Sequence, residues 1–223
     1  MKRSLLSLLV AAALPLSATA QVEATPTQDA EKAEAKKPKV YKIGTQVPAD
    51  LKLKDIDGKE LTMKELRGKI VVIAWYAIYC PGIKATEDRL KAMAKKYDEG
   101  KEVVLIAINS DKGELSDARP VGLDKDGKPL KPFPRIRGYM KDKEINFRMF
   151  VDPGNKVADL FQAKTTPHMF VLDPKGVVRY SGALDNDMSL KKEKEDYVHY
   201  VDQAVSAIKA KQEVTTTTTK PYG

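Results

Sequence analysis

The sequence contains a single cysteine, Cys80, among its 223 residues. One cysteine cannot form a disulfide within the chain, so this thiol must stay free, pair with another molecule or become oxidised. Histidines are also few, at His168 and His199. A single cysteine supplies only one soft thiolate ligand, and the acidic residues lack the spacing of a calcium loop. We therefore expect neither a metal nor a cofactor.

The sequence also lacks an apolar run long enough to span a membrane comfortably. The stretch from Leu5 to Leu16 follows Lys2 and Arg3 and precedes three small residues, 18–20. This pattern is typical of a secretory signal peptide over residues 1–20. We expect an exported protein, periplasmic or secreted, without a transmembrane segment after cleavage.

Basic residues outnumber acidic ones, and the formal net charge is +8. No basic cluster is interleaved with stacking aromatic residues, and lysines alternate with acids, as in KKEKED at residues 191–196. A solvated surface explains this balance. We therefore expect no nucleic-acid partner.

Composition divides the remainder of the chain into three segments. Residues 21–39 are rich in Ala, Glu, Lys, Thr and Pro, which predicts a disordered linker. Residues 40–211 carry regular apolar periodicity over the length of one domain. Residues 212–223 include five successive threonines and predict a disordered tail.

The first half of the domain predicts strands around one helix. Residues 51–54 and 61–63 flank an Asp57-Gly58 turn and predict an N-terminal β-hairpin. Residues 70–76 form an apolar run without polar interruption, typical of a strand buried on both faces, and residues 103–109 predict a second continuous strand. A helical pattern between these two runs implies that they pair in parallel.

The second half begins with a Pro- and Gly-rich insert at residues 114–134, which predicts a long irregular loop. The elements expected after it are a helix at 136–143, a strand at 147–151, a helix at 156–161, a hairpin of strands at 169–172 and 177–180, and a final helix with Tyr197, Val201 and Ile208 on its apolar face. Together these elements predict an α/β fold with a mixed central sheet and helices on both faces.

Cys80 lies where the strand at 70–76 ends and a helix begins with Pro81. Proline suits the first helical position because its missing N–H would be unpaired there. The unpaired N–H groups of a helix N-terminus carry partial positive charge and favour the thiolate. Since the thiolate is the nucleophile, Cys80 is the candidate catalytic residue.

The position of Cys80-Pro81 after the first buried strand, and of Thr166-Pro167 before the closing hairpin, resembles the thioredoxin fold. More narrowly, the chain resembles the redoxin group, which contains exported thiol-disulfide oxidoreductases and, more distantly, peroxiredoxins. Segments that carry the resemblance are IGTQVP at 43–48, residues 55–76, FVDPGNKVADLF at 150–161, TTPHMFVLDPKG at 165–176 and YSGALDN at 180–186. They cover nearly the whole predicted domain.

The resemblance implies roles for individual residues. Cys80 matches the first cysteine of a pair separated by two residues, and Ile83 stands where the second would be. A mixed disulfide on Cys80 would then need an external thiol for its release. The resemblance also implies a substrate-docking edge formed by Tyr79, Pro81, Thr166 and Pro167, with Pro167 preceded by a cis peptide bond.

Three functions follow as alternatives. The first is a monothiol thiol-disulfide oxidoreductase acting on protein or small-molecule thiols and disulfides. The second is a non-catalytic thioredoxin-like binding module. The third is a peroxiredoxin-type antioxidant peroxidase, for which the resemblance implies a hydroxyl three residues before the cysteine and an arginine, whereas this chain has Ala77 and Pro167. A dimer linked through Cys80, and a role for His168 as a base for Cys80, remain open.

Overall fold

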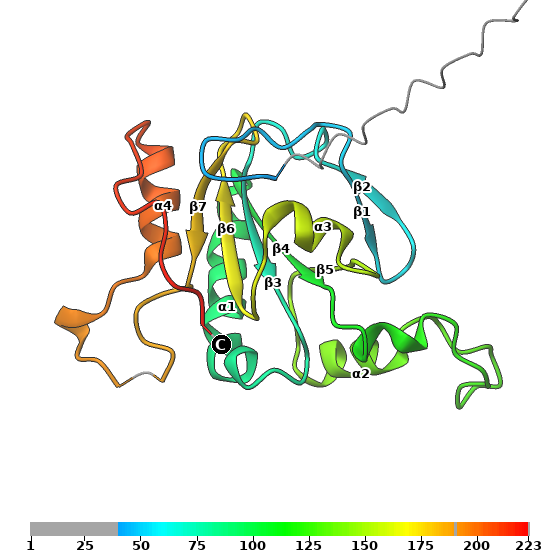
Figure 1. Ribbon diagram of the computed structural model, residues 1–223. Coiled ribbons are helices and arrows are strands. Elements are labelled where there is room, and N and C mark those ends of the chain that lie inside the picture. The colour runs from blue at the N-terminus through cyan, green and yellow to red at the C-terminus, as the bar shows by residue number, and fades with distance from the viewer. Residues whose placement is uncertain (1–39, 190, 223) are drawn as a thin grey trace, which may run out of the picture. The chain divides into compact units, whose positions relative to one another are not determined.

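The computed structural model describes residues 40–222 except residue 190 (Figure 1). The predicted signal peptide and linker, residues 1–39, lie outside this part. The elements in chain order are β1 (Lys52–Asp55), β2 (Glu60–Thr62), β3 (Ile70–Trp75), α1 (Pro81–Gly100), β4 (Val103–Asn109), η1 (Glu114–Asp117), α2 (Pro134–Asp142), β5 (Arg148–Val151), α3 (Lys156–Phe161), β6 (His168–Leu172), β7 (Val178–Gly182), η2 (Lys194–Asp196) and α4 (Tyr200–Lys209). None of the helices described is both long and apolar enough to cross a lipid bilayer.

Seven strands form one mixed sheet in the order β2-β1-β5-β4-β3-β6-β7. β3 lies near its centre, paired in parallel with β4 and antiparallel with β6. The predicted parallel pair is confirmed, as are the hairpins β1–β2 and β6–β7. Pairing of β1 with β5 attaches the N-terminal hairpin to the sheet.

The side chains of β3 explain why the sheet is covered on both faces. All six residues of this strand are buried. Val72 and Ala74 belong to one hydrophobic cluster, with α1 and α4, whereas Ile73 and Trp75 belong to a second, with α3. Burying a large aliphatic or aromatic side chain stabilises the fold by about 1.5–3 kcal/mol. The prediction of helices on both faces is confirmed.

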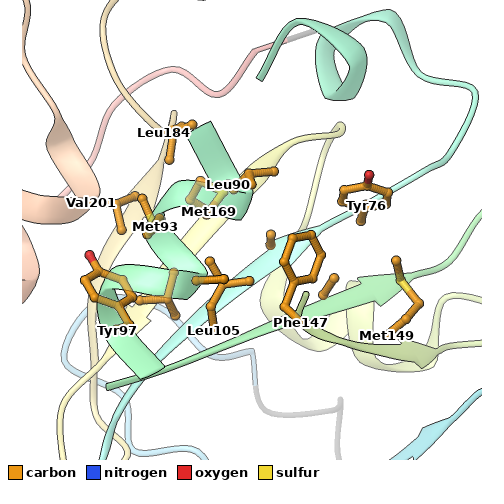
Figure 2. Close-up of a cluster of buried hydrophobic side chains, with 14 of the residues drawn as sticks. Tyr76, Leu90, Met93, Tyr97, Leu105, Phe147, Met149, Met169, Leu184 and Val201 are labelled. Carbon is orange, nitrogen blue, oxygen red and sulfur yellow. The ribbon is translucent and has the colours of Figure 1, made fainter. Parts of the chain in front are cut away.

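Helix α1 positions the functional site because its apolar stripe fixes it on the sheet. Figure 2 shows Leu90, Met93 and Tyr97 of α1 packed in the first cluster with Leu105 of β4 and Met169 of β6. These three helical residues follow the spacing of three and four expected from the sequence. The N-terminus of α1 is thereby held at the end of β3, where the strand leaves the sheet.

The final helix begins three residues after Tyr197, although the sequence pattern placed Tyr197 on the apolar face of this helix. α4 starts at Tyr200, and the side chain of His199 accepts the N–H of Asp202 at 3.4 Å as an N-cap. Tyr197 precedes the helix, and its hydroxyl donates to the buried carboxylate of Asp185 at 2.8 Å. This hydrogen bond places Tyr197 outside the helical stripe.

The prediction of a disordered tail is wrong for the part of residues 212–223 that the structure describes. The N–H of Ser181 donates to the carbonyl of Thr217 at 3.0 Å, and the N–H of Thr219 donates to the carbonyl of Ser181 at 3.2 Å. The hydroxyl of Tyr222 donates to the carboxylate of Asp185. We call residues 217–222 the C-terminal strap. Composition did not predict it because backbone pairing along a sheet edge needs no apolar side chain.

Side chains also hold the C-terminal strap against β7. The hydroxyl of Thr219 accepts the N–H of Ala183 at 2.9 Å and shares a hydrogen bond with the hydroxyl of Tyr180 at 2.6 Å. A Cβ atom at Gly182 would lie 2.8 Å from the backbone nitrogen and oxygen of Thr219. Only glycine at this position permits so close an approach.

Candidate functional site

Cys80 is the N-cap residue of α1, with an extended backbone at φ −70° and ψ 126°. Its N–H donates to the carbonyl of Ala77 at 3.2 Å, and its carbonyl accepts the N–H of Lys84 at 3.1 Å. The side chain is neither buried nor fully exposed. The thiol therefore lies at the helix N-terminus that the sequence predicts, within reach of an incoming molecule.

Thr166 meets the thiol from the opposite side. The thiol of Cys80 donates to the carbonyl oxygen of Thr166, with sulfur and oxygen 2.9 Å apart. The Thr166-Pro167 peptide bond is cis. The fold thus brings together the start of α1 and the segment before β6, which are 86 residues apart in sequence.

Gly82 makes this contact sterically feasible. A Cβ atom at Gly82 would lie 2.8 Å from the carbonyl oxygen of Thr166 and 3.2 Å from Cδ of Pro167. Gly82 is one of the two residues between Cys80 and Ile83, and its place in the sequence indicates no other role. The absence of a side chain two residues after the candidate nucleophile was the only available signal.

We predict that Gly82→Ala destabilises the fold by about 1–3 kcal/mol, because α1 and the Thr166-Pro167 segment must move apart. Chemical denaturation measures this loss, and the alkylation rate of Cys80 should change with it. Gly138→Ala in α2 is the matched control, since a Cβ there meets no atom within 4 Å. It should instead stabilise by up to about 1 kcal/mol. Equal effects at the two sites would contradict the steric argument.

The other predicted docking residues differ in exposure. Tyr79 is 56 % exposed, so its ring is not part of the core. Pro81 is exposed and Thr166 is half-buried, whereas Pro167 is buried. Three of the four candidates therefore reach the surface near Cys80.

Ile83 is fully buried in the hydrophobic cluster of α1. Its side chain completes the core at the position where the resemblance implies a second cysteine. No other thiol exists in the chain. Among the residues described, no three His, Cys, Asp or Glu side chains gather as a metal site.

Comparison with known proteins supports the resemblance. The model of the AhpC/TSA family matches residues 43–181, more than half of the chain. The chain belongs to the AhpC/TSA family. The matched region includes Cys80 and the Thr166-Pro167 segment.

Two relatives of this AhpC/TSA-family chain carry the name thiol-disulfide oxidoreductase ResA. The Bacillus cereus protein is 24% identical over 136 residues, covering 61% of this chain and 66% of its own length. The Halalkalibacterium halodurans protein is 27% identical over 128 residues, covering 56% of this chain and 60% of its own length. The chain thus spans somewhat less than two thirds of the relatives it matches.

Solved structures confirm the predicted thioredoxin-like fold of this family member. A hypothetical protein from Sinorhizobium meliloti aligns with a TM-score of 0.63 and 23% identity, over 82% of this chain and 92% of that chain. A Chlorobium tepidum protein, provisionally named as a thiol:disulfide interchange protein DsbE, aligns with a TM-score of 0.53 and 18% identity, over 75% and 98% of the two chains. At these identities the likeness shows the fold alone.

Glu114, in the insert of this AhpC/TSA-family chain, holds the loop that precedes Cys80. Its buried carboxylate accepts the N–H of Ile78 at 2.8 Å, the N–H of Tyr79 at 2.9 Å and the side-chain amide of Asn109 at 2.6 Å. The insert was predicted as a long irregular loop, but its first residues form η1, and Glu114 of η1 contacts the loop before Cys80. Nothing in the local sequence indicates this partner, since Glu114 is 35 residues from Tyr79.

His168 is buried and does not bond to the thiol. Its Nδ1 accepts the N–H of Lys164 at 3.2 Å, and its Nε2 pairs with the hydroxyl of Ser181 at 3.0 Å. Burial, with a smaller contribution from the charge of Lys164, lowers the pKa of His168 to about 4. The ring therefore stays neutral at pH 7, and both of its nitrogens are engaged away from Cys80.

This lowered pKa predicts a loss of stability in acid. Between about pH 6.5 and pH 4 the unfolded imidazole binds a proton that the folded one does not, so the free energy of unfolding falls as the pH falls. A shift of this size corresponds to about 3 kcal/mol. His168→Asn should lower the free energy of unfolding at pH 7.5. It should also reduce the additional loss of this free energy between pH 7.5 and pH 4 by about 3 kcal/mol. Urea denaturation at both pH values measures the two effects. If the variant and the parent lost the same free energy of unfolding between pH 7.5 and pH 4, the lowered pKa of His168 would not explain the acid sensitivity.

Proposed function

We propose that this chain is a monothiol thiol-disulfide oxidoreductase that reacts through Cys80. The observation that carries the proposal is the partly exposed Cys80 at the N-cap of α1, in contact with the Thr166 carbonyl that precedes cis-Pro167. The names of the ResA relatives agree with this chemistry. The proposed docking edge consists of Tyr79, Pro81, Thr166 and Pro167, and the carbonyl of Thr166 contacts the sulfur.

The reaction requires the thiol to lose its proton to water, which ends its hydrogen bond to Thr166. The thiolate attacks one sulfur of a substrate disulfide, a new bond to Cys80 forms, and the substrate's other sulfur leaves as a thiolate that takes up a proton. Unpaired N–H groups at the start of α1 stabilise the charged sulfur. Since Ile83 has no thiol, an external thiolate must attack the mixed disulfide to restore Cys80.

The test measures the formation of a disulfide adduct on Cys80. The folded protein is mixed with hydroxyethyl disulfide, and intact mass is recorded against time. We expect one adduct, at Cys80, formed at least 10-fold faster than in the urea-unfolded chain and absent in Cys80→Ser. An excess of glutathione should remove the adduct and sustain turnover. A folded protein that reacts no faster than the unfolded chain would exclude an activated thiol.

A second candidate function is a non-catalytic binding module. The insert carries two exposed apolar side chains, Val121 at 97 % and Leu123 at 66 % exposure. Contiguous exposed apolar surface is typical of protein contacts, and these two residues lie two positions apart. Under this alternative Cys80→Ser keeps the biological phenotype, whereas under the proposed function it loses it.

A peroxidase is the least supported alternative. Ala77 is buried and carries no hydroxyl, and Pro167 supplies no guanidinium to polarise a peroxide. Oxidation of Cys80 to a sulfenic acid would then be slow.

Export is part of the proposal and depends on residues 1–20 alone. A positively charged start, an apolar stretch and small residues up to Ala20 support cleavage by a signal peptidase. The mature protein isolated from cells should begin at Gln21. An intact N-terminus on the cytoplasmic side would refute export.

A further inference from the structure

His168 adjoins the thiol site but takes no part in the proposed reaction. It is the first residue of β6, directly after cis-Pro167, and it is buried. Its ring packs against the ring of Phe170, with the two centroids 4.4 Å apart. Both ring nitrogens are bonded to groups other than Cys80, so the histidine is not the base for this thiol. A buried polar ring in this place needs another explanation.

The Nδ1 atom of His168 closes the loop that leads into β6. It accepts the N–H of Lys164, four residues earlier in the chain, at 3.2 Å. The loop, residues 164–167, carries the Thr166 carbonyl that accepts the thiol of Cys80 at 2.9 Å. Within the described part of the chain, these are the only two hydrogen bonds that residues 164–167 make. The position of the Thr166 carbonyl therefore depends on the His168 side chain.

The Nε2 atom fixes the imidazole ring from its other side. Because Nδ1 accepts a hydrogen bond, the neutral ring is assigned its proton on Nε2, which donates to the hydroxyl of Ser181 at 3.0 Å. The main chain of Ser181 is itself bonded to the C-terminal strap. Rotation of the ring would break at least one of its two buried hydrogen bonds, so the ring has one preferred orientation.

The carbonyl that this loop presents to Cys80 favours the thiol over the thiolate. A carbonyl oxygen accepts a hydrogen bond from S–H, whereas it repels a negatively charged sulfur. The start of α1 acts in the opposite direction, because its unpaired N–H groups stabilise the thiolate. The position of the Thr166 carbonyl therefore influences how readily Cys80 attacks an electrophile.

We propose that His168 is a positioning residue, which holds the Thr166 carbonyl against Cys80 and so slows the reaction of the resting thiol with small electrophiles. This role rests on the proposed function, because it concerns the same sulfur. Outside the cytoplasm a lone cysteine is open to oxidation to sulfenic acid and beyond, and the chain has no second thiol to reverse that damage. A hydrogen-bonded thiol reacts more slowly with such oxidants, since the thiolate is the nucleophile.

Two variants separate the roles of the two ring nitrogens. The side-chain oxygen of asparagine reaches the place of Nδ1 and can accept the N–H of Lys164, whereas the longer glutamine amide reaches the place of Nε2 and can donate to Ser181. His168→Asn therefore keeps the loop contact and His168→Gln loses it, although both remove the ring from the core. His199→Gln is the matched control, because the Nδ1 of His199 also accepts a backbone N–H, that of Asp202.

The first measurement is the S–H stretching band in the Raman spectrum, which belongs to Cys80 alone because the chain has one cysteine. Donating a hydrogen bond weakens the S–H bond and lowers this frequency. We expect a lower frequency in the folded parent than in the urea-unfolded chain, and the parent frequency in His168→Asn and His199→Gln. In His168→Gln the band should rise toward the frequency of the unfolded chain.

The second measurement is the rate at which iodoacetamide alkylates Cys80 at pH 7. We expect His168→Gln to react about 3- to 10-fold faster than the parent, which is the effect of losing one neutral hydrogen bond. His168→Asn and His199→Gln should stay within about 2-fold of the parent, since the loop contact remains in both. Urea denaturation gives the unfolded fraction of each variant, so that alkylation through global unfolding is subtracted.

The asparagine and glutamine variants decide between positioning and a purely structural role. Equal band frequencies and equal rates in the two would overturn the proposal, because a histidine that only fills the core does not distinguish its nitrogens. A raised band in His168→Gln without faster alkylation would also overturn it. His168→Leu, which removes both nitrogens and keeps an apolar side chain, should match His168→Gln and replaces it if that variant does not fold.

The proposed function and the role of His168 fail in different measurements. A folded parent that exchanges with hydroxyethyl disulfide no faster than the unfolded chain removes the proposed function, whatever the Raman band shows. A parent band that is no lower in the folded state than in urea removes the thiol contact, and with it the role of His168, whatever the rate of exchange.

Discussion

Replacing Ile83 with cysteine should let Cys80 close a disulfide within its own chain. Residues three apart in the first turn of a helix have Cα atoms roughly 5 Å apart, inside the range that a disulfide spans. The introduced thiol would then attack a small-thiol adduct on Cys80 and release it without any added thiol, so the lifetime of the adduct should fall at least 100-fold. Intact mass after removal of free thiol measures that lifetime.

The control is Ile83→Ser, which removes the same apolar volume and adds no thiol. Both variants lose stability by about 1–3 kcal/mol, because Ile83 is fully buried. A similar adduct lifetime in both would show that position 83 does not face the sulfur of Cys80. It would also refute the view that the missing second thiol limits this protein.

Replacing Glu114 with alanine should destabilise the fold by about 3–5 kcal/mol. The change leaves two backbone N–H groups, of Ile78 and Tyr79, and the amide of Asn109 without their acceptor. Each buried donor left unpaired costs about 1–3 kcal/mol. Urea denaturation monitored by circular dichroism measures the loss.

Glu114→Gln keeps the shape but exchanges one acceptor oxygen for a donor, so it should lose roughly half as much. This milder variant also tests the site, because a displaced loop at Tyr79 should change the alkylation rate of Cys80 in the folded protein. Glu193→Ala, at an exposed position, is the matched control and should lie within about 0.5 kcal/mol of the parent. A harmless Glu114→Ala would contradict the role assigned to this carboxylate.

The central strands were predictable because their side chains are almost all apolar, which indicates burial on both faces of the sheet. The run at 70–76 has no polar interruption, and β3 is buried at every position. Helix α3 has the predicted bounds, 156–161. The start of α4 was not predictable, because Tyr197 is apolar enough to continue the stripe, whereas its hydroxyl binds Asp185 outside the helix.

The candidate site was predictable only in part. The helix start at Pro81 placed Cys80, and the resemblance paired it with the Thr166-Pro167 segment, which the structure places 2.9 Å from the sulfur. Glu114 was not found. Its contribution depends on the contact between η1 and the loop at Ile78 and Tyr79, which lie 36 and 35 residues away in sequence.

The C-terminal strap has a consequence for how the molecule meets others of its kind. Along the outer side of β7, the amide and carbonyl of Ser181 are already occupied by Thr217 and Thr219. Were the strap to lift, those groups would become a template for an extended segment from a neighbouring molecule, and self-association would follow. The threonine-rich strap adds little to the core, but it covers the edge of β7 and so opposes edge-to-edge association of two molecules.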